Sequence, residues 1–453
     1  MLQDKILDYK DDVVKSIQEA IRIKSVEEAP LPGMPFGEGP AKALVHFLEL
    51  GEKLGFESTN FDNYAGHIDF GDGEETLAIL GHVDVVPEGE GWDHDPYGGI
   101  IADGKIYGRG TLDDKGPMIM CMYAMKALKD SGLKLNKKIR MILGANEETN
   151  WGCMDHYFGT LEMPQPTLAF TPDSSFPVTF AEKGIMQVTM TKNIDTKNIT
   201  IEGGKAFNSV AESCEMVFPA ELLTTLEAKV KEYNENNEYK MEIKDGKLIS
   251  YGKSSHGARP QSGYNAISAL MGTLEGLDLG EISEFVTFYN SKIGMELNGV
   301  SMGIGFEDAD SGKLSLNIGK LSIKDGKIEL SIDMRYPVTT KKEAVLEGLE
   351  KAAAENNFVL TVKSESDALY FPKDTVLVKT LMDVYKEITG DVDAEPVAIG
   401  GGTYARAVDN GVAFGALLHD QEDNMHQKNE YLEISKLDTL LKIYVEAIYR
   451  LAK

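Results

Sequence analysis

The stretch TLAILGHVDVV (residues 76–86) predicts an apolar strand that leads directly to His82 and Asp84. An amphipathic helix, PMIMCMYAMKALKDSG (117–132), follows it, and two more apolar strands come next, KIRMILGANEE (138–148) and TLAFTPD (167–173). Strands that alternate with helical crossovers are typical of an α/β fold. We therefore expect a mixed, mostly parallel sheet sandwiched by helices.

Polar residues follow the apolar runs of this predicted sheet. They are His82, Glu147 with Glu148, Asp173 and, after the run VAFGALLH (412–419) and a short loop, His426. Ligands of open α/β sheets gather outside the carboxyl ends of the strands. The sequence thus predicts one rim at which these side chains meet.

Residues 184–372 have a different texture, with scattered strands and helices that indicate an α+β domain. Because His426 lies beyond this segment, the chain must leave the first domain, build a second one and return. We expect a catalytic domain of residues 1–183 and 373–453, with residues 184–372 as an inserted lid domain. The segment FAEKG (180–184) and the proline of LYFPKD (369–374) mark the boundaries.

The composition excludes several classes of partner. Lys and Arg total 46 against 73 Asp and Glu, and a formal charge of −27 opposes binding to nucleic acid or to an anionic membrane. Residues 1–26 mix acids and bases at helical spacing and lack the apolar core of a signal peptide. Three scattered cysteines, Cys121, Cys153 and Cys214, favour a reducing cytoplasm.

The rim residues suit a metal site. In GHVDVV, His82 and Asp84 share one face of a strand, so a carboxylate could accept the second imidazole N–H of a ligating histidine. A histidine buried in the core would give the same pattern. In YGRGTLDDKGP, Asp113 and Asp114 lie in a glycine-rich turn, where two buried acids repel unless a cation neutralises them. The alternative is a solvated turn that caps the helix near Pro117.

The neighbours Glu147 and Glu148 can point in different directions. One carboxylate could bind a metal while the other serves as a general base, which is the division that metal-assisted hydrolysis requires. Adjacent glutamates are also common on helix faces. With Asp173 and His426, the set comprises two histidines and three carboxylate ligands, which zinc accepts and which cobalt or manganese would also fit.

Eight motifs occur along the chain in the order GHVDVVP, GRGTLDDKGP, NEET, TPD, SSHGARPQSGYNA, IDMRYP, GGGTYAR and MHQKNE. Taken together, they resemble the co-catalytic zinc peptidase family that includes PepV-type dipeptidases, carnosinase, aminoacylase and succinyl-diaminopimelate desuccinylase. The PepV-type dipeptidases are the most similar subgroup, and the resemblance implies a catalytic domain with an inserted lid.

The resemblance implies a role for each rim residue. Asp113 would bridge two ions and join Asp114 through a cis peptide bond. Glu148 with His426 would hold one ion, and His82 with Asp173 the other. The resemblance also makes Glu147 the general base and Asp84 the residue that orients His82.

For the lid, the resemblance implies His256 as an oxyanion donor and Asn208 and Arg335 as substrate-binding residues. Gly401, Gly402 and Thr403 would form a backbone nest for the terminal carboxylate of the substrate. Arg335 could instead be a surface charge, and Asn208 could simply begin a turn. The long insertion is similar to PepV-type lids, which favours a monomer.

The implied activity is hydrolysis of dipeptides with a free N-terminus, by a metal-bridging water that Glu147 activates. Two divalent ions per chain are implied, zinc first, with manganese or cobalt as alternatives. In this family an aspartate at the position of Asp173 goes with dipeptidases and aminopeptidases, whereas glutamate goes with carboxypeptidases and deacylases. The alternatives are an N-acyl-amino-acid deacylase and, more remotely, a catalytically silent metal- or peptide-binding protein.

Overall fold

The computed structural model describes residues 2–453, which form two compact units. The first unit contains the chain up to Phe180, Phe371–Val397 and Gly402–Lys453, and the second contains Ala181–Tyr370 and Ala398–Gly401. The sequence places residues 398–401 in the catalytic domain, whereas the structure groups them with the second unit. The guanidinium of Arg335 donates to the carbonyl oxygen of Gly400 at 3.2 Å, which holds this segment there.

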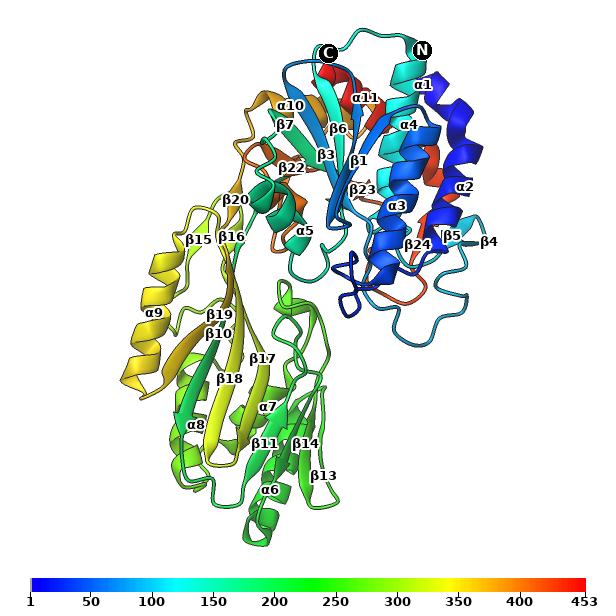
Figure 1. Cartoon of the computed structure of the whole chain (residues 1–453). Helices are drawn as coiled ribbons and strands as arrows, with labels where there is room; N and C mark the ends of the chain where they lie inside the picture. Colours follow the sequence, from blue (N-terminus) through cyan, green and yellow to red (C-terminus); the bar gives the residue numbers. More distant parts are fainter. Residues whose placement is uncertain (1) are drawn as a thin grey trace. The chain divides into compact units, whose positions relative to one another are not determined.

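The central strands of a mixed nine-stranded sheet form the core of the first unit (Figure 1). Its strands lie in the order β1 (Glu57–Phe61), β2 (Ala65–Phe70), β6 (Lys138–Gly144), β3 (Thr76–His82), β7 (Leu168–Thr171), β22 (Gly411–Ala413), β9 (Thr179–Glu182) and β20 (Leu369–Tyr370), with β21 (Val397–Ile399) paired to β9. The α/β class and a mixed sheet are confirmed, but the prediction of mostly parallel pairing is wrong. Parallel pairing is confined to the central strands β6, β3, β7 and β22, and the flanking pairs are antiparallel.

Helices cover both faces of this sheet. On one face, Gly51 of α3 (Glu38–Lys53) packs against Ile68 of β2, and Gly81 of β3 packs against Met118 of α4 (Lys115–Ser131). On the opposite face, Gly144 at the end of β6 lies against Tyr404. A side chain at Gly81 or Gly144 would collide with these helical segments, so glycine allows the close approach. Further helices of this unit are α1 (Leu2–Lys5), α2 (Lys10–Ile21), α5 (Gly152–Met154), α10 (Val376–Thr389) and α11 (Leu437–Ala452), with the 3-10 turn η5 (Tyr404–Ala407).

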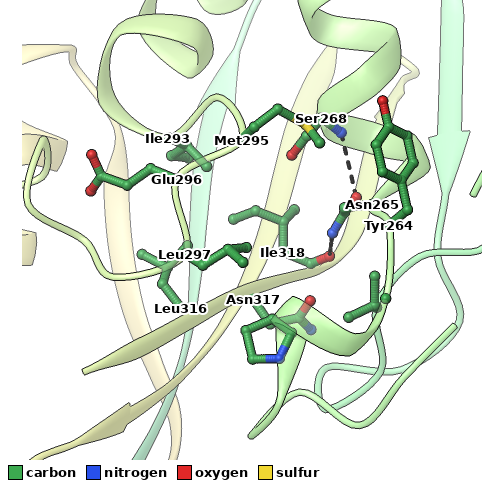
Figure 2. Close-up of a pocket in the computed structure, with 13 residues that line it drawn as sticks. Tyr264, Asn265, Ser268, Ile293, Met295, Glu296, Leu297, Leu316, Asn317 and Ile318 are labelled. Carbon is green, nitrogen blue, oxygen red and sulfur yellow. Dashed lines mark hydrogen bonds between the residues drawn. The ribbon is translucent and has the colours of Figure 1, made fainter. Parts of the chain in front are cut away.

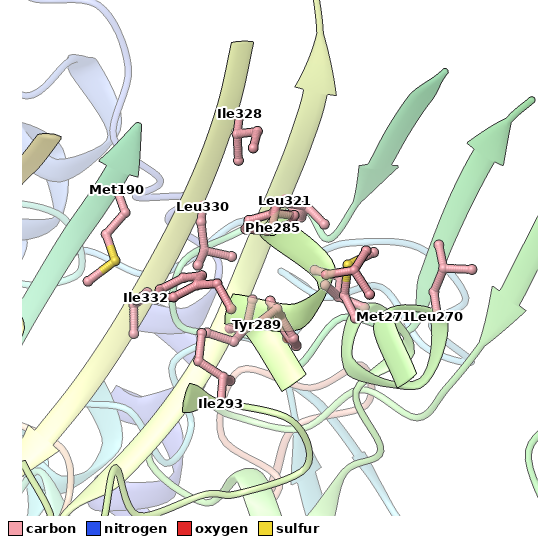
Figure 3. Close-up of a cluster of buried hydrophobic side chains, with 14 of the residues drawn as sticks. Met190, Leu270, Met271, Phe285, Tyr289, Ile293, Leu321, Ile328, Leu330 and Ile332 are labelled. Carbon is pink, nitrogen blue, oxygen red and sulfur yellow. The ribbon is translucent and has the colours of Figure 1, made fainter. Parts of the chain in front are cut away.

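The second unit is built on an eight-stranded antiparallel sheet. Its order is β13 (Met241–Lys244), β14 (Lys247–Tyr251), β12 (Ser213–Val217), β11 (Thr200–Gly203), β17 (Ser315–Lys324), β18 (Lys327–Tyr336), β10 (Gly184–Asn193) and β19 (Val359–Ser366). Its helices are α6 (Leu223–Asn236), α7 (Ala266–Leu274), α8 (Glu281–Lys292) and α9 (Lys342–Glu355). Figure 3 shows Phe285 and Tyr289 of α8 among Leu321, Leu330 and Ile332 of the sheet, and all five are buried. This separate apolar core fits the α+β domain that the sequence predicts.

Shorter strands complete the fold. They are β4 (Ile100–Ala102), β5 (Lys105–Tyr107) and β24 (Tyr431–Glu433) in one small sheet, β8 (Ser174–Ser175) with β23 (Ala416–Leu417) in another, and β15 (Glu307–Asp308) with β16 (Gly312–Lys313) in the second unit. All three cysteines are free and buried. Within residues 2–453, no helix combines the length and the apolar character needed to cross a bilayer.

Candidate metal centre

The predicted rim exists at the carboxyl ends of three neighbouring strands. His82 is the last residue of β3, Glu147 and Glu148 follow β6, and Asp173 follows β7. Because β3 pairs in parallel with both β6 and β7, all three strands deliver their polar residues to the same edge of the sheet. The pairing of the central strands therefore explains why residues far apart in sequence meet here.

Asp113 lies between the two histidines of the set. One carboxylate oxygen, Oδ1, is 2.9 Å from His82 Nε2, and the other, Oδ2, is 2.7 Å from His426 Nε2. Asp113 precedes α4, and its peptide bond to Asp114 is cis, as the resemblance implies. Each oxygen of one carboxylate thus faces a different histidine.

Two groups of ligand atoms result, and they share Asp113. The first consists of His82, Asp113 and Asp173, and the second of Asp113, Glu148 and His426. Within each group the ligand atoms lie within 4.8 Å of one another. His82 Nε2 is 3.8 Å from Asp173 Oδ2, and His426 Nε2 is 3.1 Å from Glu148 Oε1. All five predicted ligands are therefore brought together.

The two groups differ in exposure to solvent. The side chains of His82 and Asp113 are buried, whereas the side chain of His426 is 53% exposed. Burial opposes a charge on the His82 imidazole, and partial desolvation opposes one on His426, but the adjoining carboxylates outweigh both effects. Asp113 and Asp84 raise the pKa of His82 well above its usual range, and Asp113 and Glu148 raise the pKa of His426 to about 11.

The carboxylates at the rim repel one another. Burial raises the pKa of the Asp173 carboxyl well above its usual range, and the charge of Asp113 raises it further. Burial likewise raises the pKa of Glu147, and Glu148 adds to the shift although His82 opposes it. Several acids packed this closely in a buried place call for a cation.

The donor atoms fit a divalent metal. Each group offers one imidazole nitrogen and two carboxylate oxygens, which are the N and O ligands that zinc accepts. Cobalt and manganese also bind such sets. Glu147 belongs to neither group among the described residues, although it is the sequence neighbour of Glu148.

Asp84 makes contacts that the sequence does not predict. The Nδ1 atom of His82 is 3.0 Å from the backbone carbonyl of Asp84 and 3.5 Å from its carboxylate. The carboxylate oxygens instead accept hydrogen bonds from the backbone N–H groups of Glu147, at 3.0 Å, and Glu148, at 3.1 Å. Asp84 therefore fixes the loop that carries both glutamates as well as facing His82.

Tyr404 is a neighbour of the site to which the sequence assigns no role. Its buried ring lies edge-on to the His82 imidazole, with 6.0 Å between the ring centroids. Its hydroxyl is 2.8 Å from Cys153 Sγ. The GGGTYAR motif contains Tyr404, but only the packing of η5 against β3 reveals its contact with a ligand.

The predicted lid residues lie in the second unit, and three of them occupy adjoining segments. The N–H of Gly257, next to His256, donates to the carbonyl oxygen of Asn208 at 2.7 Å. Arg335 is buried, and its guanidinium donates to Asp333 at 3.1 and 3.3 Å. Ala258 lies against Gly400, whose carbonyl accepts from Arg335. Asn208, His256 and Arg335 are thus close to one another within this unit.

The predicted carboxylate nest is divided between the two units, with Gly401 in the second and Gly402 and Thr403 in the first. The hydroxyl of Thr403 accepts a hydrogen bond from the N–H of Ala405 at 3.2 Å, which caps η5. The proposed role of these residues in binding a carboxylate stays a prediction.

The SSHGARPQSGYNA motif also contains a structural residue. Figure 2 shows Asn265 in the lining of a cavity, whose volume is about 60 Å³. Its amide oxygen accepts a hydrogen bond from the backbone N–H of Ser268 at 3.4 Å, and its amide N–H donates to the carbonyl of Ile318 at 2.8 Å. Asn265 therefore caps α7 and ties it to β17. None of the predicted site residues lines this cavity.

Comparison with known proteins shows the family of the chain. Residues 78–450 match the model of the peptidase family M20/M25/M40. The chain belongs to this family. One relative of this M20/M25/M40 chain is the Bacillus subtilis (strain 168) protein named "Putative dipeptidase YtjP". The two are 39% identical over 466 residues, and the alignment covers 99% of each chain. A Staphylococcus epidermidis protein named "Putative dipeptidase" is 36% identical over 468 residues, 100% of this chain and 99% of its own.

Solved structures share the M20/M25/M40 fold at low sequence identity. Human carnosine dipeptidase 1 has a TM-score of 0.59 at 16% identity, over 100% of this chain and 98% of its own. The dipeptidase Dug1p of Saccharomyces cerevisiae has a TM-score of 0.58 at 15% identity, over 99% and 98%. At such identities the likeness shows the fold alone.

Proposed function

We propose that this chain is a two-metal dipeptidase that hydrolyses the peptide bond of dipeptides with a free N-terminus. The observation that carries the proposal is the pair of ligand groups that share Asp113 at the rim of the sheet. The names of the M20 relatives as dipeptidases support the substrate class. Asp173, an aspartate in place of glutamate, supports it further through the family pattern.

Two divalent ions bound at these groups, zinc in the first instance, would polarise the scissile carbonyl and lower the pKa of a water molecule to about 7. The protein would hold them with His82 and Asp173 on one side and Glu148 and His426 on the other. Asp113, which offers one oxygen to each side, would be common to both.

Glu147 is the general base in this proposal. It removes the proton of the attacking water as a general base and later, as a general acid, returns a proton to the leaving nitrogen. Two features support this role: Glu147 lies outside both ligand groups, and the carboxylate of Asp84 fixes its backbone N–H at 3.0 Å. Asp84 also faces His82, so a single residue orients a ligand and the base.

The residues of the second unit would bind the substrate. His256 donates a hydrogen bond to the developing oxyanion, which is worth about 2.7–4 kcal/mol for a single donor. Asn208 and Arg335 bind the peptide, and the Gly401–Thr403 segment receives its terminal carboxylate. Asp333 holds the guanidinium of Arg335 in a fixed orientation for that contact.

A substrate panel tests the proposal. Metal-reconstituted protein is expected to cleave free dipeptides at least about 100-fold better, in kcat/KM, than the matching tripeptides or dipeptides with a blocked amine, because unpaired polar groups in a closed site discriminate strongly. Preference for N-acetyl or N-succinyl amino acids would favour the deacylase instead. Full metal occupancy without turnover of any substrate would indicate a silent binding protein.

A further inference from the structure

A buried ion pair lies beside the candidate metal centre and plays no part in the proposed reaction. Arg109 is 2% exposed and Glu430 is fully buried, and Arg109 Nη1 donates to Glu430 Oε2 at 2.7 Å. The two residues belong to the motifs GRGTLDDKGP and MHQKNE, which also contain the ligands Asp113 and His426. A buried charge needs such a partner, because an unpaired one is strongly destabilising.

The other carboxylate oxygen of Glu430 binds the turn that leads to Asp113. Glu430 Oε1 accepts hydrogen bonds from the backbone N–H groups of Gly110, at 3.1 Å, and Leu112, at 2.9 Å. The backbone carbonyl of Glu430 also accepts the N–H of Gly108 at 2.9 Å. Leu112 is the residue immediately before Asp113, so Glu430 fixes the backbone from which that ligand projects.

Glu430 lies on the same loop as His426, and hydrogen bonds also join this loop to residues 87–99. Asn429 and Asp93 exchange two hydrogen bonds of 2.8 Å. Arg109 donates its backbone N–H to Pro96 at 2.8 Å. The loop around residues 87–99 thereby braces both partners of the ion pair.

We propose that Glu430 is a positioning residue that sets the separation of Asp113 from His426, and through it the affinity of the candidate centre for metal. Its carboxylate connects the two ligand-bearing loops directly, with Arg109 as its counter-charge. The inference rests on the metal centre of the proposed function. Partners outside the ligand set typically change metal affinity by about 10–100-fold when they are removed.

The first test is Glu430→Gln, which keeps the shape of the side chain. The new amide presents to the backbone N–H groups of Gly110 and Leu112 either its NH₂ group, which cannot accept, or its neutral oxygen, which is a weaker acceptor than a carboxylate. We expect its Zn²⁺ affinity, measured by competition with a chelator, to fall by about 10–100-fold. The visible absorption of the Co²⁺-loaded variant should also change, because the geometry at His426 is altered. Wild-type affinity with a wild-type Co²⁺ spectrum in the folded variant would overturn the inference.

A double variant separates positioning from simple stabilisation. Arg109→Met with Glu430→Leu replaces the ion pair by apolar groups, which commonly restores stability. It leaves Gly110 and Leu112 without their acceptor, so the Zn²⁺ affinity should stay low even if the melting temperature recovers. Recovery of both would show that the pair only stabilises the fold. This double variant also carries the test if Glu430→Gln does not fold.

Asp69→Asn provides a matched control. Asp69 accepts two hydrogen bonds from Arg140, at 2.7 and 2.6 Å, between β2 and β6 of the same unit, and among the described residues it forms no hydrogen bond with a loop that carries a ligand. It should lower the melting temperature and leave Zn²⁺ affinity unchanged. If the wild type binds Zn²⁺ but cleaves no dipeptide, the proposed reaction fails while weaker binding by Glu430→Gln still upholds the inference. If the wild type cleaves dipeptides and Glu430→Gln binds Zn²⁺ equally well, only the inference fails.

Discussion

Glu147→Gln is expected to lower kcat for dipeptides by about 10²–10⁴-fold while the metal content of the protein stays at the wild-type level. Glutamine has nearly the shape of glutamate but cannot take a proton from water. Because Glu147 lies in neither ligand group, its loss should leave the ions in place. Steady-state kinetics and elemental analysis of the same preparation check both halves of this expectation.

Glu148→Gln is the matched control, since the two residues adjoin and both backbone N–H groups donate to Asp84. Glu148 Oε1 lies 3.1 Å from His426 Nε2, so its replacement should lower metal content as well as activity. A fully metallated Glu147→Gln variant with wild-type turnover would remove Glu147 as the base. Loss of metal in that variant would make Glu147 a ligand instead.

Asp113→Ala is expected to abolish binding of both ions, and with it all hydrolysis, because each carboxylate oxygen faces a different histidine. The activity should fall to the level of the metal-free protein. Asp173→Ala removes a carboxylate from one group only, so it should lower the affinity for one ion and leave the affinity for the other unchanged. Zn²⁺ stoichiometry by isothermal titration distinguishes the two variants.

An Asp113→Ala variant that still binds one ion with wild-type affinity would contradict a shared carboxylate. An Asp173→Ala variant that binds both ions with equally reduced affinity would contradict the division of ligands into two groups. His67, which lies on β2 and contacts Tyr157 at 2.8 Å, offers a histidine control outside the site. Its replacement by asparagine should leave the stoichiometry unchanged.

The rim of the sheet could be predicted from sequence because the rule behind it is local. An apolar run marks each strand, and the next polar residue lies at its carboxyl end, as His82 and Asp173 do. The confinement of parallel pairs to the central strands could not be predicted. It depends on which strands become neighbours in space. Strand β2 pairs with β6 in antiparallel orientation, although β3 lies between them in the sequence.

Contacts between segments that are distant in sequence could not be predicted either. The carboxylate of Asp84 faces His82 Nδ1 at 3.5 Å, but the hydrogen bonds that it accepts from the backbone N–H groups of Glu147 and Glu148, on the adjoining strand end, could not be predicted. Arg109 and Glu430 are 321 positions apart, and nothing in either motif indicates that they pair. Such partners follow from tertiary packing, which brings loops together without leaving a periodic pattern in the sequence.

Whether this chain is a two-metal dipeptidase is decided by a metal titration of the metal-free wild-type protein, with bound Zn²⁺ and dipeptide hydrolysis followed together. Because each of the two ligand groups would hold one ion, we expect negligible hydrolysis without metal and a maximal rate once two ions are bound per chain. Manganese and cobalt titrations extend the test to the alternative metals. The two-metal dipeptidase proposal would be wrong if the metal-free protein hydrolysed dipeptides, or if the protein bound two ions and hydrolysed no free dipeptide.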